Sequence, residues 1–296
     1  MRHWRASWQH LRGRPWMVRI KEGLRSIPTL PLRMANGPEK LLLSVGLRSP
    51  ASLCLPNFLG IGAQKAGTTW LHENLRHHPD LLLPEAKEVH YFNRDFHRSL
   101  RSYSAIFEAG RDKVRGEITP AYSILPLRRI RFIRKIMPDV RLILLLRDPV
   151  DRAWSQALYG MVQYGERPYA GISREELLGY LNADWSVRRG DYLTILDHWL
   201  SVFPPEQMLI GFFEEIASDP QGLLSRVFHH IGVRSDVDWS AFPSREVVLK
   251  GPEIPMPPEV RELLEARYGP QREALRARLG TAADTWHRAR ASRSEG

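Results

Sequence analysis

The sequence is poor in cysteine, since Cys54 is the only one among 296 residues. A single cysteine excludes an intrachain disulfide framework and fits a reducing compartment. The histidines also lack the spacing of a zinc site, because His77-His78 and His229-His230 are adjacent pairs without spaced Cys or His partners. We therefore expect no metal in this protein.

Long apolar runs are absent as well. No stretch approaches the 18 apolar residues of a membrane span, and the first residues lack the apolar region of a signal peptide. These absences argue against a transmembrane segment. The chain is accordingly expected in the cytoplasm.

Acidic residues are scarce near the N-terminus. Residues 1–50 hold ten Lys or Arg and two Glu, which is +8 of the +10 net charge of the whole chain. Because the charge belongs to this arm, it is weak evidence for nucleic-acid binding by the rest, and we predict no nucleic-acid partner. Trp4, Trp8 and Leu11 fall on one helical face, so three alternatives stay open: a peripheral membrane helix, a flexible basic tail, or a helix packed on the domain.

Apolar and aromatic residues, by contrast, are plentiful: 43% of the chain is hydrophobic, with nine Trp, nine Tyr and ten Phe. This composition supports a substantial core in a single domain. A linker rich in Pro and Gly runs from Pro28 to Pro56. We predict an arm and linker over residues 1–55, a globular domain over 56–282 and a C-terminal tail over 283–296.

The most informative segment is Phe58-Leu-Gly-Ile-Gly-Ala-Gln-Lys-Ala-Gly-Thr-Thr-Trp70. It predicts a short strand, a glycine turn with one lysine, and a helix that opens with two threonines. Backbone N–H groups and the helix dipole converge at such a turn and favour an anion. Lys65 adds a mobile cation, so the pattern predicts a phosphate site.

Other phosphate loops fit this segment less well. A nucleotide triphosphatase loop places its lysine directly after the second glycine, where this chain has Thr68. A dinucleotide-binding loop requires a glycine at the position of Lys65. The remaining alternative is a plain glycine turn with a solvated lysine.

Strands and helices alternate along the predicted domain. Strands are expected at 58–62, 114–119, 141–146 and 207–213, and helices at 69–78, 98–109, 126–137, 149–164, 173–181, 191–203, 217–231 and 258–279. This alternation predicts an α/β fold with a central, mainly parallel sheet. Ligands of such sheets bind beyond the carboxyl ends of the strands, where the Lys65 loop and Arg147 both lie.

The segment Leu142-Ile-Leu-Leu-Leu-Arg-Asp-Pro-Val-Asp-Arg-Ala-Trp-Ser155 repeats the strand-to-helix order. Arg147 ends the strand, and Ser155 lies one or two turns into the helix. A guanidinium fork and a hydroxyl suit a second phosphate. The alternative is an arginine paired with Asp148 or Asp151 beside an ordinary helix serine.

With these two segments the chain resembles the sulfotransferases that use 3′-phosphoadenosine 5′-phosphosulfate (PAPS). Gln64-Lys-Ala-Gly-Thr-Thr-Trp70 resembles their 5′-phosphosulfate loop, and Arg147-Asp-Pro-Val-Asp-Arg-Ala-Trp-Ser155 resembles their 3′-phosphate motif. Four further segments resemble the heparan-sulfate-type branch and its bacterial relatives: Lys87-Glu-Val-His-Tyr-Phe92, Thr119-Pro-Ala-Tyr122, Gly190-Asp-Tyr-Leu193 and Lys250-Gly251. The resemblance runs in order from Asn57 to Gly280 and implies a P-loop-like three-layer fold.

The resemblance also implies a role for each matching residue. Lys65 would contact the leaving phosphate and the bridging oxygen. The surrounding loop would hold the 5′-phosphate through Ala66, Gly67, Thr68 and Thr69. Arg147 and Ser155 would hold the 3′-phosphate, while Lys250 and Gly251 would close over the nucleotide. Trp70 matches a tryptophan that stacks on adenine in cytosolic relatives.

Glu88 matches the general base of the heparan-type branch. An acceptor hydroxyl must lose its proton as it attacks sulfur, and a carboxylate within hydrogen-bond reach can take it. The alternative for Glu88 is a solvated loop acid paired with Lys87. His90 is a neighbour of the transferred group, a second candidate base, or a packing residue.

We therefore predict an enzyme that moves a sulfuryl group from PAPS to a hydroxyl, or less readily an amine, of a glycan or other small acceptor. Two rival predictions are a P-loop kinase or triphosphatase, and an inactive glycan-binding protein on the same scaffold. The chain lacks the C-terminal disulfide and the membrane anchor of animal relatives, which indicates a bacterial-type enzyme. Acceptor choice is expected to depend on loops near 92–112, 160–190 and 235–256.

Overall fold

A computed structural model of the chain describes residues 37–44, 47, 49–280 and 286. Its core is a five-stranded sheet in the order β2-β3-β1-β4-β5. The strands are β1 (Phe58–Gly62), β2 (Leu81–Leu82), β3 (Val114–Ile118), β4 (Arg141–Leu146) and β5 (Met208–Phe212). Every neighbouring pair is parallel, which confirms the predicted α/β class with a parallel sheet.

The central strands are buried on both faces, as a sheet covered by helices requires. All five residues of β1 are buried, and in β4 only Arg141 is exposed. Close packing also explains Gly116 in β3, since a Cβ there would lie 2.2 Å from Cζ of Phe58. The register pairs Phe58 with Gly116 on one side and with Arg141 on the other.

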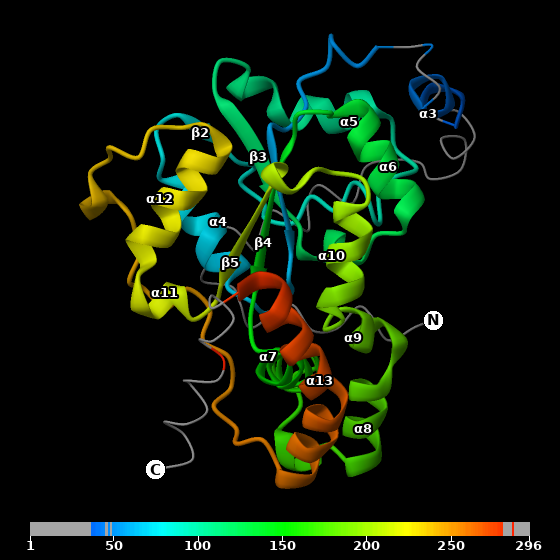
Figure 1. Cartoon of the computed structure of the whole chain (residues 1–296), viewed down its shortest axis with the longest axis vertical. Helices are drawn as coiled ribbons and strands as arrows, with labels where there is room; N and C mark the ends of the chain where they lie inside the picture. The colour runs from blue at the N-terminus through cyan, green and yellow to red at the C-terminus, as the bar shows by residue number, and fades with distance from the viewer. Residues whose placement is uncertain (1–36, 45–46, 48, 281–285, 287–296) are drawn as a thin grey trace.

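Helices cover both faces of the sheet (Figure 1). The helices α4 (Thr68–Arg76) and α12 (Pro220–Ile231) lie on one side, and α6 (Leu127–Ile136) and α10 (Tyr192–Leu200) on the other. This arrangement gives the three layers expected from the resemblance.

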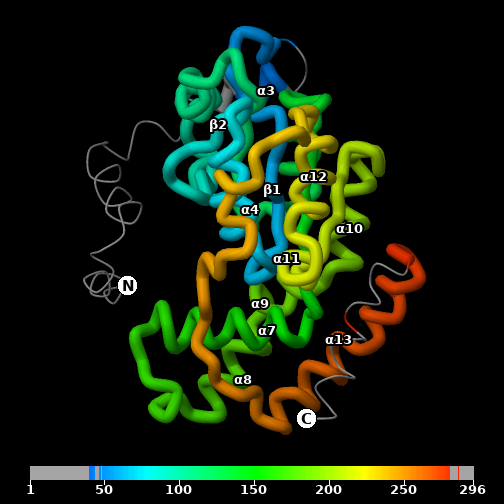
Figure 2. The backbone as a smooth tube through the Cα atoms, turned by 90° about the vertical axis from the view of Figure 1, so that its left-hand side faces the viewer, coloured from blue at the N-terminus to red at the C-terminus, as the bar shows by residue number. Residues whose placement is uncertain are grey.

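A second group of helices lies beyond the carboxyl end of β4. It comprises α7 (Pro149–Ala157), α8 (Arg174–Asn182), α9 (Asp184–Arg188) and α13 (Pro258–Leu279). Three of them, α7, α8 and α13, share a smaller apolar core that includes Trp154, Leu177 and Leu264. Figure 2 shows them gathered at one end of the molecule, with α3 (Gly37–Ser44) at the other.

Several expected elements differ in detail. The expected helix 98–109 is a short α5 (Leu100–Ser104) followed by a 3₁₀ segment (Ala105–Gly110), and the helix expected to reach 164 is α-helical only to Ala157 and then becomes a π-helical turn over Leu158–Gln163. The expected helix 217–231 divides into α11 (Glu215–Ser218) and α12, because Asp219 caps a new helix that has Pro220 at its first position. Strand β2 lies in a segment without a predicted element.

The prediction of a linker from Pro28 to Pro56 is wrong over residues 37–44. That segment forms α3, which packs against α6 and buries Leu43 to 2% exposure. The amphipathic segment with Trp4, Trp8 and Leu11 lies outside the described residues. None of the helices that the structure describes is both long and apolar enough to span a bilayer.

Candidate functional site

The turn between β1 and α4 presents an uncapped helix end. Gly67 precedes α4 with φ +85°, a left-handed conformation that favours glycine, and no described side chain caps the helix. A Cβ on Gly67 would lie 2.2 Å from Cδ1 of Ile216, so the position also requires close approach. The N-terminal N–H groups of α4 are thus left without a side-chain acceptor at this end.

Lys65 lies within this turn and also has a left-handed backbone, with φ +67°. Its ammonium lies 4.1 Å from the ring centroid of Tyr159. Burial, together with the positive charges of Arg147 and Lys87, lowers the pKa of Lys65 to about 8. The charges of Arg147 and Lys87 thus act against that of Lys65, and a bound anion would relieve this repulsion.

Arg147 links the end of β4 to this turn. Its Nη1 donates a hydrogen bond to the Lys65 carbonyl oxygen at 3.3 Å, and its guanidinium lies 4.4 Å from the ring centroid of Phe213. Its own carbonyl accepts a hydrogen bond of 3.0 Å from the Tyr192 hydroxyl. The structure thus brings together the two strand ends that the sequence analysis singled out.

Asp148, the next residue, has a structural use. Its carboxylate accepts hydrogen bonds from the amides of Val150 at 2.8 Å and Asp151 at 3.3 Å, and it caps α7. Its second oxygen lies 3.5 Å from Nη1 of Arg272, a buried side chain that also pairs with Glu265. Asp148 therefore anchors α13 to the start of α7.

Glu88 and His90 lie in the segment between β2 and α5, and both have left-handed backbones, with φ +66° and +59°. The Glu88 carboxylate lies 2.8 Å from Nζ of Lys87 and 3.2 Å from Nε2 of His90. Burial opposes ionisation, but the charge of Lys87 and the hydrogen bonds from His90 and Lys87 outweigh it and lower the pKa of Glu88 to about 2. The ion pair with Lys87 is what we expected if Glu88 were a loop acid, and the same ion pair leaves an ionised carboxylate that could act as a base.

Sequence reasoning missed Glu117, a buried carboxylate near the end of β3. One oxygen accepts hydrogen bonds from the hydroxyls of Tyr103 at 2.6 Å and Tyr122 at 2.9 Å, and the other accepts from Thr119 at 2.7 Å. Burial raises the pKa of Glu117, while the three hydroxyl donors act to lower it. The only signal in the sequence was an acidic residue within a strand expected in the sheet.

The Glu117 network reaches the Glu88 segment through two hydroxyls. Thr119 Oγ1 accepts a hydrogen bond from the His90 amide at 3.4 Å, and Tyr122 Oη accepts from the Phe92 amide at 3.3 Å. Each hydroxyl therefore donates to the buried carboxylate and accepts from the loop. Glu117 fixes the direction of both hydroxyls and through them the backbone near His90.

His72 in α4 is a second buried polar side chain that sequence reasoning missed. It is 1% exposed, and neither ring nitrogen has a hydrogen-bond partner among the described residues. Burial, with the charges of Lys87 and Arg76, lowers the pKa of His72 to about 3, so the ring is neutral. The charges of Glu88 and Lys87 both act on the pKa of His72, Glu88 raising it and Lys87 lowering it.

The other predicted site residues lie in varied surroundings. Ala66 and Thr68 are buried, and Thr69 and Ser155 are partly exposed. Trp70 is 4% exposed and its Nε1 donates to the Ser244 carbonyl oxygen at 2.9 Å, so most of its ring is already covered by the protein. Lys250 has a 67% exposed side chain and pairs with Glu253 at 2.8 Å, while Gly251 is partly exposed.

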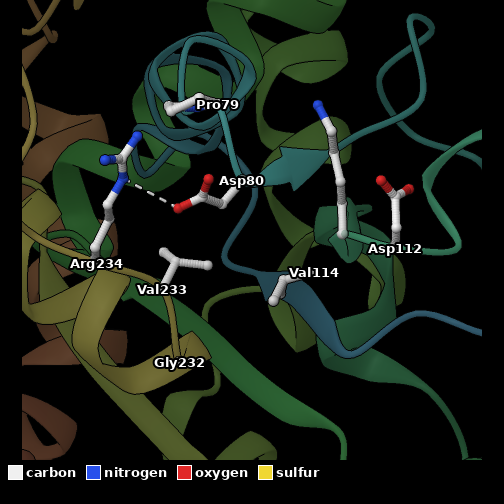
Figure 3. A pocket seen from close by; sticks show the side chains of 8 residues that line it. Pro79, Asp80, Asp112, Val114, Gly232, Val233 and Arg234 are labelled. Carbon is white, nitrogen blue, oxygen red and sulfur yellow. Dashed lines mark ion pairs between the residues drawn. The ribbon is translucent and has the colours of Figure 1, made fainter.

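A pocket of about 360 Å³ lies away from these residues (Figure 3). Its wall includes Val114, the first residue of β3, and the ion pair of 3.1 Å between Asp80 and Arg234. It is therefore at the amino ends of the parallel strands, opposite the turns that carry Lys65 and Arg147. Across the residues that the structure covers, no three His, Cys, Asp or Glu side chains gather as a metal-ligand group.

Comparisons with known proteins agree with this geometry. Human heparan sulfate glucosamine 3-O-sulfotransferase 6 is 34% identical over 188 residues, which are 62% of this chain and 54% of that protein. The membrane-associated sulfotransferase kil1 of Dictyostelium discoideum is 26% identical over 68% of this chain and 60% of its own length. The chain thus spans between half and two thirds of the length of these relatives.

A solved structure and a family model also match sulfotransferases. The sulfotransferase from Alicyclobacillus acidocaldarius superposes with a TM-score of 0.61 and 25% identity, over 76% of this chain and 96% of that one. Residues 55–245 match the family model described as a sulfotransferase domain. The match covers more than half of the sequence, and the chain therefore belongs to the sulfotransferase domain family.

Proposed function

We propose that this protein transfers a sulfuryl group from PAPS to a hydroxyl of a glycan. The observation that carries the proposal is the contact between Lys65 and Arg147, which joins two cationic strand ends a short way from Glu88. Membership of the sulfotransferase family supports the reaction class. The names of the heparan sulfate relatives support a glycan acceptor.

The residues at the two strand ends fit a doubly phosphorylated nucleotide. The uncapped end of α4 offers N–H groups to a 5′-phosphate, and Thr68 and Thr69 add hydroxyl donors. Arg147 and Ser155 are assigned to the 3′-phosphate. When bound, PAPS supplies an activated sulfuryl group on a good leaving phosphate.

Lys65 is assigned to the leaving side of the reaction. Negative charge grows on the oxygen that departs from sulfur, and a buried ammonium stabilises such charge more strongly than a solvated one. Burial and the neighbouring cations lower the pKa of Lys65 to about 8, which leaves it charged at neutral pH. Removal of a preorganised donor of this kind typically costs about 3 kcal/mol in the barrier.

Glu88 is assigned to the attacking side. With a pKa of about 2, its carboxylate is ionised at neutral pH and ready to accept a proton. It is a weak base in the free protein, but the acceptor hydroxyl becomes acidic as its oxygen bonds to sulfur, so proton transfer late in the displacement suits it. His90, at 3.2 Å from the carboxylate, is the second candidate base or a positioning residue.

Two experiments test the assignment. Calorimetry should detect binding of 3′,5′-ADP without magnesium, whereas a P-loop kinase or triphosphatase would instead require magnesium and ATP. Radiolabelled PAPS should transfer its label to a member of a glycan panel, and the absence of transfer despite tight binding would favour the inactive glycan-binding alternative.

The Glu88→Gln variant separates chemistry from binding. We expect a loss of turnover of about a hundredfold or more, with the affinity for 3′,5′-ADP retained, because the amide keeps the shape but cannot accept the proton. Glu85→Gln, in the same loop, is the matched control. Full turnover in the Glu88 variant would remove Glu88 as the base and leave His90.

The proposal includes a cellular location. We retain the prediction of a cytoplasmic protein, and peripheral membrane contact through the basic arm stays one of the three alternatives for that arm. A relative named as membrane-associated supports such contact. Membrane partition of the full chain, measured with and without residues 1–36, tests the contribution of the arm.

A further inference from the structure

Helix α6 carries an unusual excess of positive charge. Its sequence Leu127-Arg-Arg-Ile-Arg-Phe-Ile-Arg-Lys-Ile136 has five cations and no acid. Ile130, Ile133 and Ile136 face the core, and Arg128, Arg131 and Lys135 are exposed. Among the described residues these three exposed cations form no ion pair with an acid, so their charge faces the solvent uncompensated.

A hollow of about 410 Å³ lies between α6 and α3. Five of its eight lining residues are Lys or Arg, and the other three are apolar: Leu41, Phe96 and Phe132. Figure 1 shows α3 beside α6 at one edge of the molecule, away from α7 and α13. The hollow is therefore separate from the helices that lie beyond the end of β4.

The wall of this hollow is held by specific contacts. Lys40 of α3 donates hydrogen bonds to the carbonyl oxygens of Phe96 and Arg98, and its ammonium lies 4.3 Å from the Phe96 ring centroid. Arg129 of α6 lies over the same ring at 3.2 Å and donates to the Phe92 carbonyl oxygen at 2.7 Å. Lys40 and Arg129 thus hold the wall in place, and the three exposed cations of α6 also line the hollow.

Exposed leucines border the cations. Leu41 and Leu42 of α3 are 62% and 40% exposed, and Leu47 just after the helix is 77% exposed. Three large apolar side chains so close together on a surface indicate an interaction site more often than a single one would. The surface defined by Leu41, Leu42, Leu47 and the exposed cations of α6 is called the α3–α6 surface below.

The chemistry of this surface selects among possible occupants. The N-terminal arm is a poor candidate, because residues 1–36 carry eight Lys or Arg against one Glu and would be repelled by α6. An acidic polysaccharide would satisfy the cations but offers no hydrocarbon to the leucines. An anionic bilayer supplies both, since its phosphates attract Lys and Arg while its acyl region accepts apolar side chains.

We propose that the α3–α6 surface docks the folded domain on an anionic phospholipid bilayer, with lipid phosphates in the basic hollow and the leucines at the acyl boundary. Residues 1–36 precede α3 in the sequence and carry further positive charge, which an anionic bilayer also attracts. Stable attachment usually needs two such signals. The proposal is independent of the sulfuryl transfer assigned above.

Vesicle sedimentation of the full chain tests this docking. Vesicles of phosphatidylcholine with about a third phosphatidylserine are compared with vesicles of phosphatidylcholine alone, for wild type and for Arg128→Glu/Arg131→Glu/Lys135→Glu. We expect the triple variant to lose affinity for the anionic vesicles by roughly a hundredfold, since each cation near a charged surface contributes on the order of a factor of five. A thermal unfolding curve establishes that the variant is folded.

A matched control carries the same charge change elsewhere. Arg174→Glu/Arg261→Glu/Arg276→Glu alters three exposed arginines of α8 and α13 and should retain most of the vesicle affinity. Leu41→Ser/Leu42→Ser/Leu47→Ser keeps every charge and should weaken binding about tenfold, mainly the part that resists high salt. This leucine variant also serves if the charge variant fails to fold.

The outcomes that overturn the proposal are distinct. Unchanged vesicle binding in both the charge and leucine variants would assign membrane contact to the arm alone. If the charge variant loses binding to a soluble acidic polysaccharide but keeps its vesicle binding, the α3–α6 surface is a glycan site instead. Equal loss in the α8 and α13 control would indicate a response to net charge without a defined docking face.

Discussion

Two strand-to-helix turns at the same edge of the sheet treat their helix ends in opposite ways. After β1, Gly67 leads into α4 without a side-chain cap among the described residues. After β4, Asp148 caps α7 and its carboxylate occupies the amides of Val150 and Asp151. The first turn leaves main-chain donors for a ligand, whereas the second fills them and offers the side chain of Arg147.

This difference suggests a division of labour between the turns. Main-chain donors and a crowded lysine respond to charge that develops on a bound group, because they are fixed before the reaction begins. An arginine fork suits a phosphate whose charge stays constant. We therefore expect the β1 turn to control turnover and the β4 turn to control affinity.

The largest expected effect breaks the β1 turn. Lys65→Ala should lower turnover at saturating PAPS by at least about a hundredfold, because the departing oxygen loses its partly buried cation. Steady-state kinetics with labelled PAPS give kcat and KM separately. Lys113→Ala, an exposed lysine before β3, is the control. A loss confined to KM would show that Lys65 acts in binding alone and would end the proposed division.

The second effect belongs to the β4 turn. Arg147→Ala should weaken the binding of 3′,5′-ADP by about thirtyfold, since a hydrogen bond between charged groups is worth about 1.5–3 kcal/mol. Turnover at saturating PAPS should fall much less. Calorimetry checks the dissociation constant, and Arg152 is avoided as a control because it is fully buried. An unchanged dissociation constant would contradict the assignment of Arg147 to a phosphate.

The contact between these turns could be predicted from the sequence, and its reason is general. Lys65 and Arg147 each follow a short apolar run, and the ends of parallel strands meet at one edge of a sheet. Two local sequence patterns therefore predicted that Lys65 and Arg147, which are far apart in the sequence, lie close together. The cap by Asp148 was equally readable, because a proline after an acidic residue at a strand end is a strong start for a helix.

Other features depend on partners that no local pattern reveals. The buried Glu117 carboxylate accepts hydrogen bonds from the hydroxyls of Tyr103, Thr119 and Tyr122. A single acidic residue in a predicted strand gives no indication of these three donors. Helix α3 was hidden in a Pro- and Gly-rich region, and it is held by Lys40 binding to carbonyl groups more than 50 residues away. Tertiary contacts decide both cases.

The end of β3, which carries Glu117, adds a third position to the comparison between the β1 and β4 turns. Glu117→Gln should lower turnover by about tenfold and leave the affinity for 3′,5′-ADP unchanged, because the amide replaces one acceptor by a donor and loosens the hydroxyls that hold the His90 backbone. The separation of kcat from the dissociation constant distinguishes this positioning role from general loss of stability. Glu259→Gln, an exposed acid of α13, is the control. Equal losses in both quantities would make Glu117 purely structural.

The smallest effect uses pH to tell the two turns apart. Burial and neighbouring cations lower the pKa of Lys65 to about 8, so it is charged below this pH and loses its proton above it. A bound anion raises that pKa again, so affinity for 3′,5′-ADP should fall about fivefold between pH 7.5 and 9. Arginine does not titrate in this range, and the phosphates are already ionised.

Calorimetry across this pH range assigns the titration to one side chain. The Arg147→Ala variant should bind more weakly at every pH but keep the same decline, because Lys65 is intact. The Lys65→Ala variant should bind with an affinity that no longer changes between pH 7.5 and 9. If the decline persists in Lys65→Ala, another group titrates, and the β1 turn is then distinguished from the β4 turn only by its uncapped helix end.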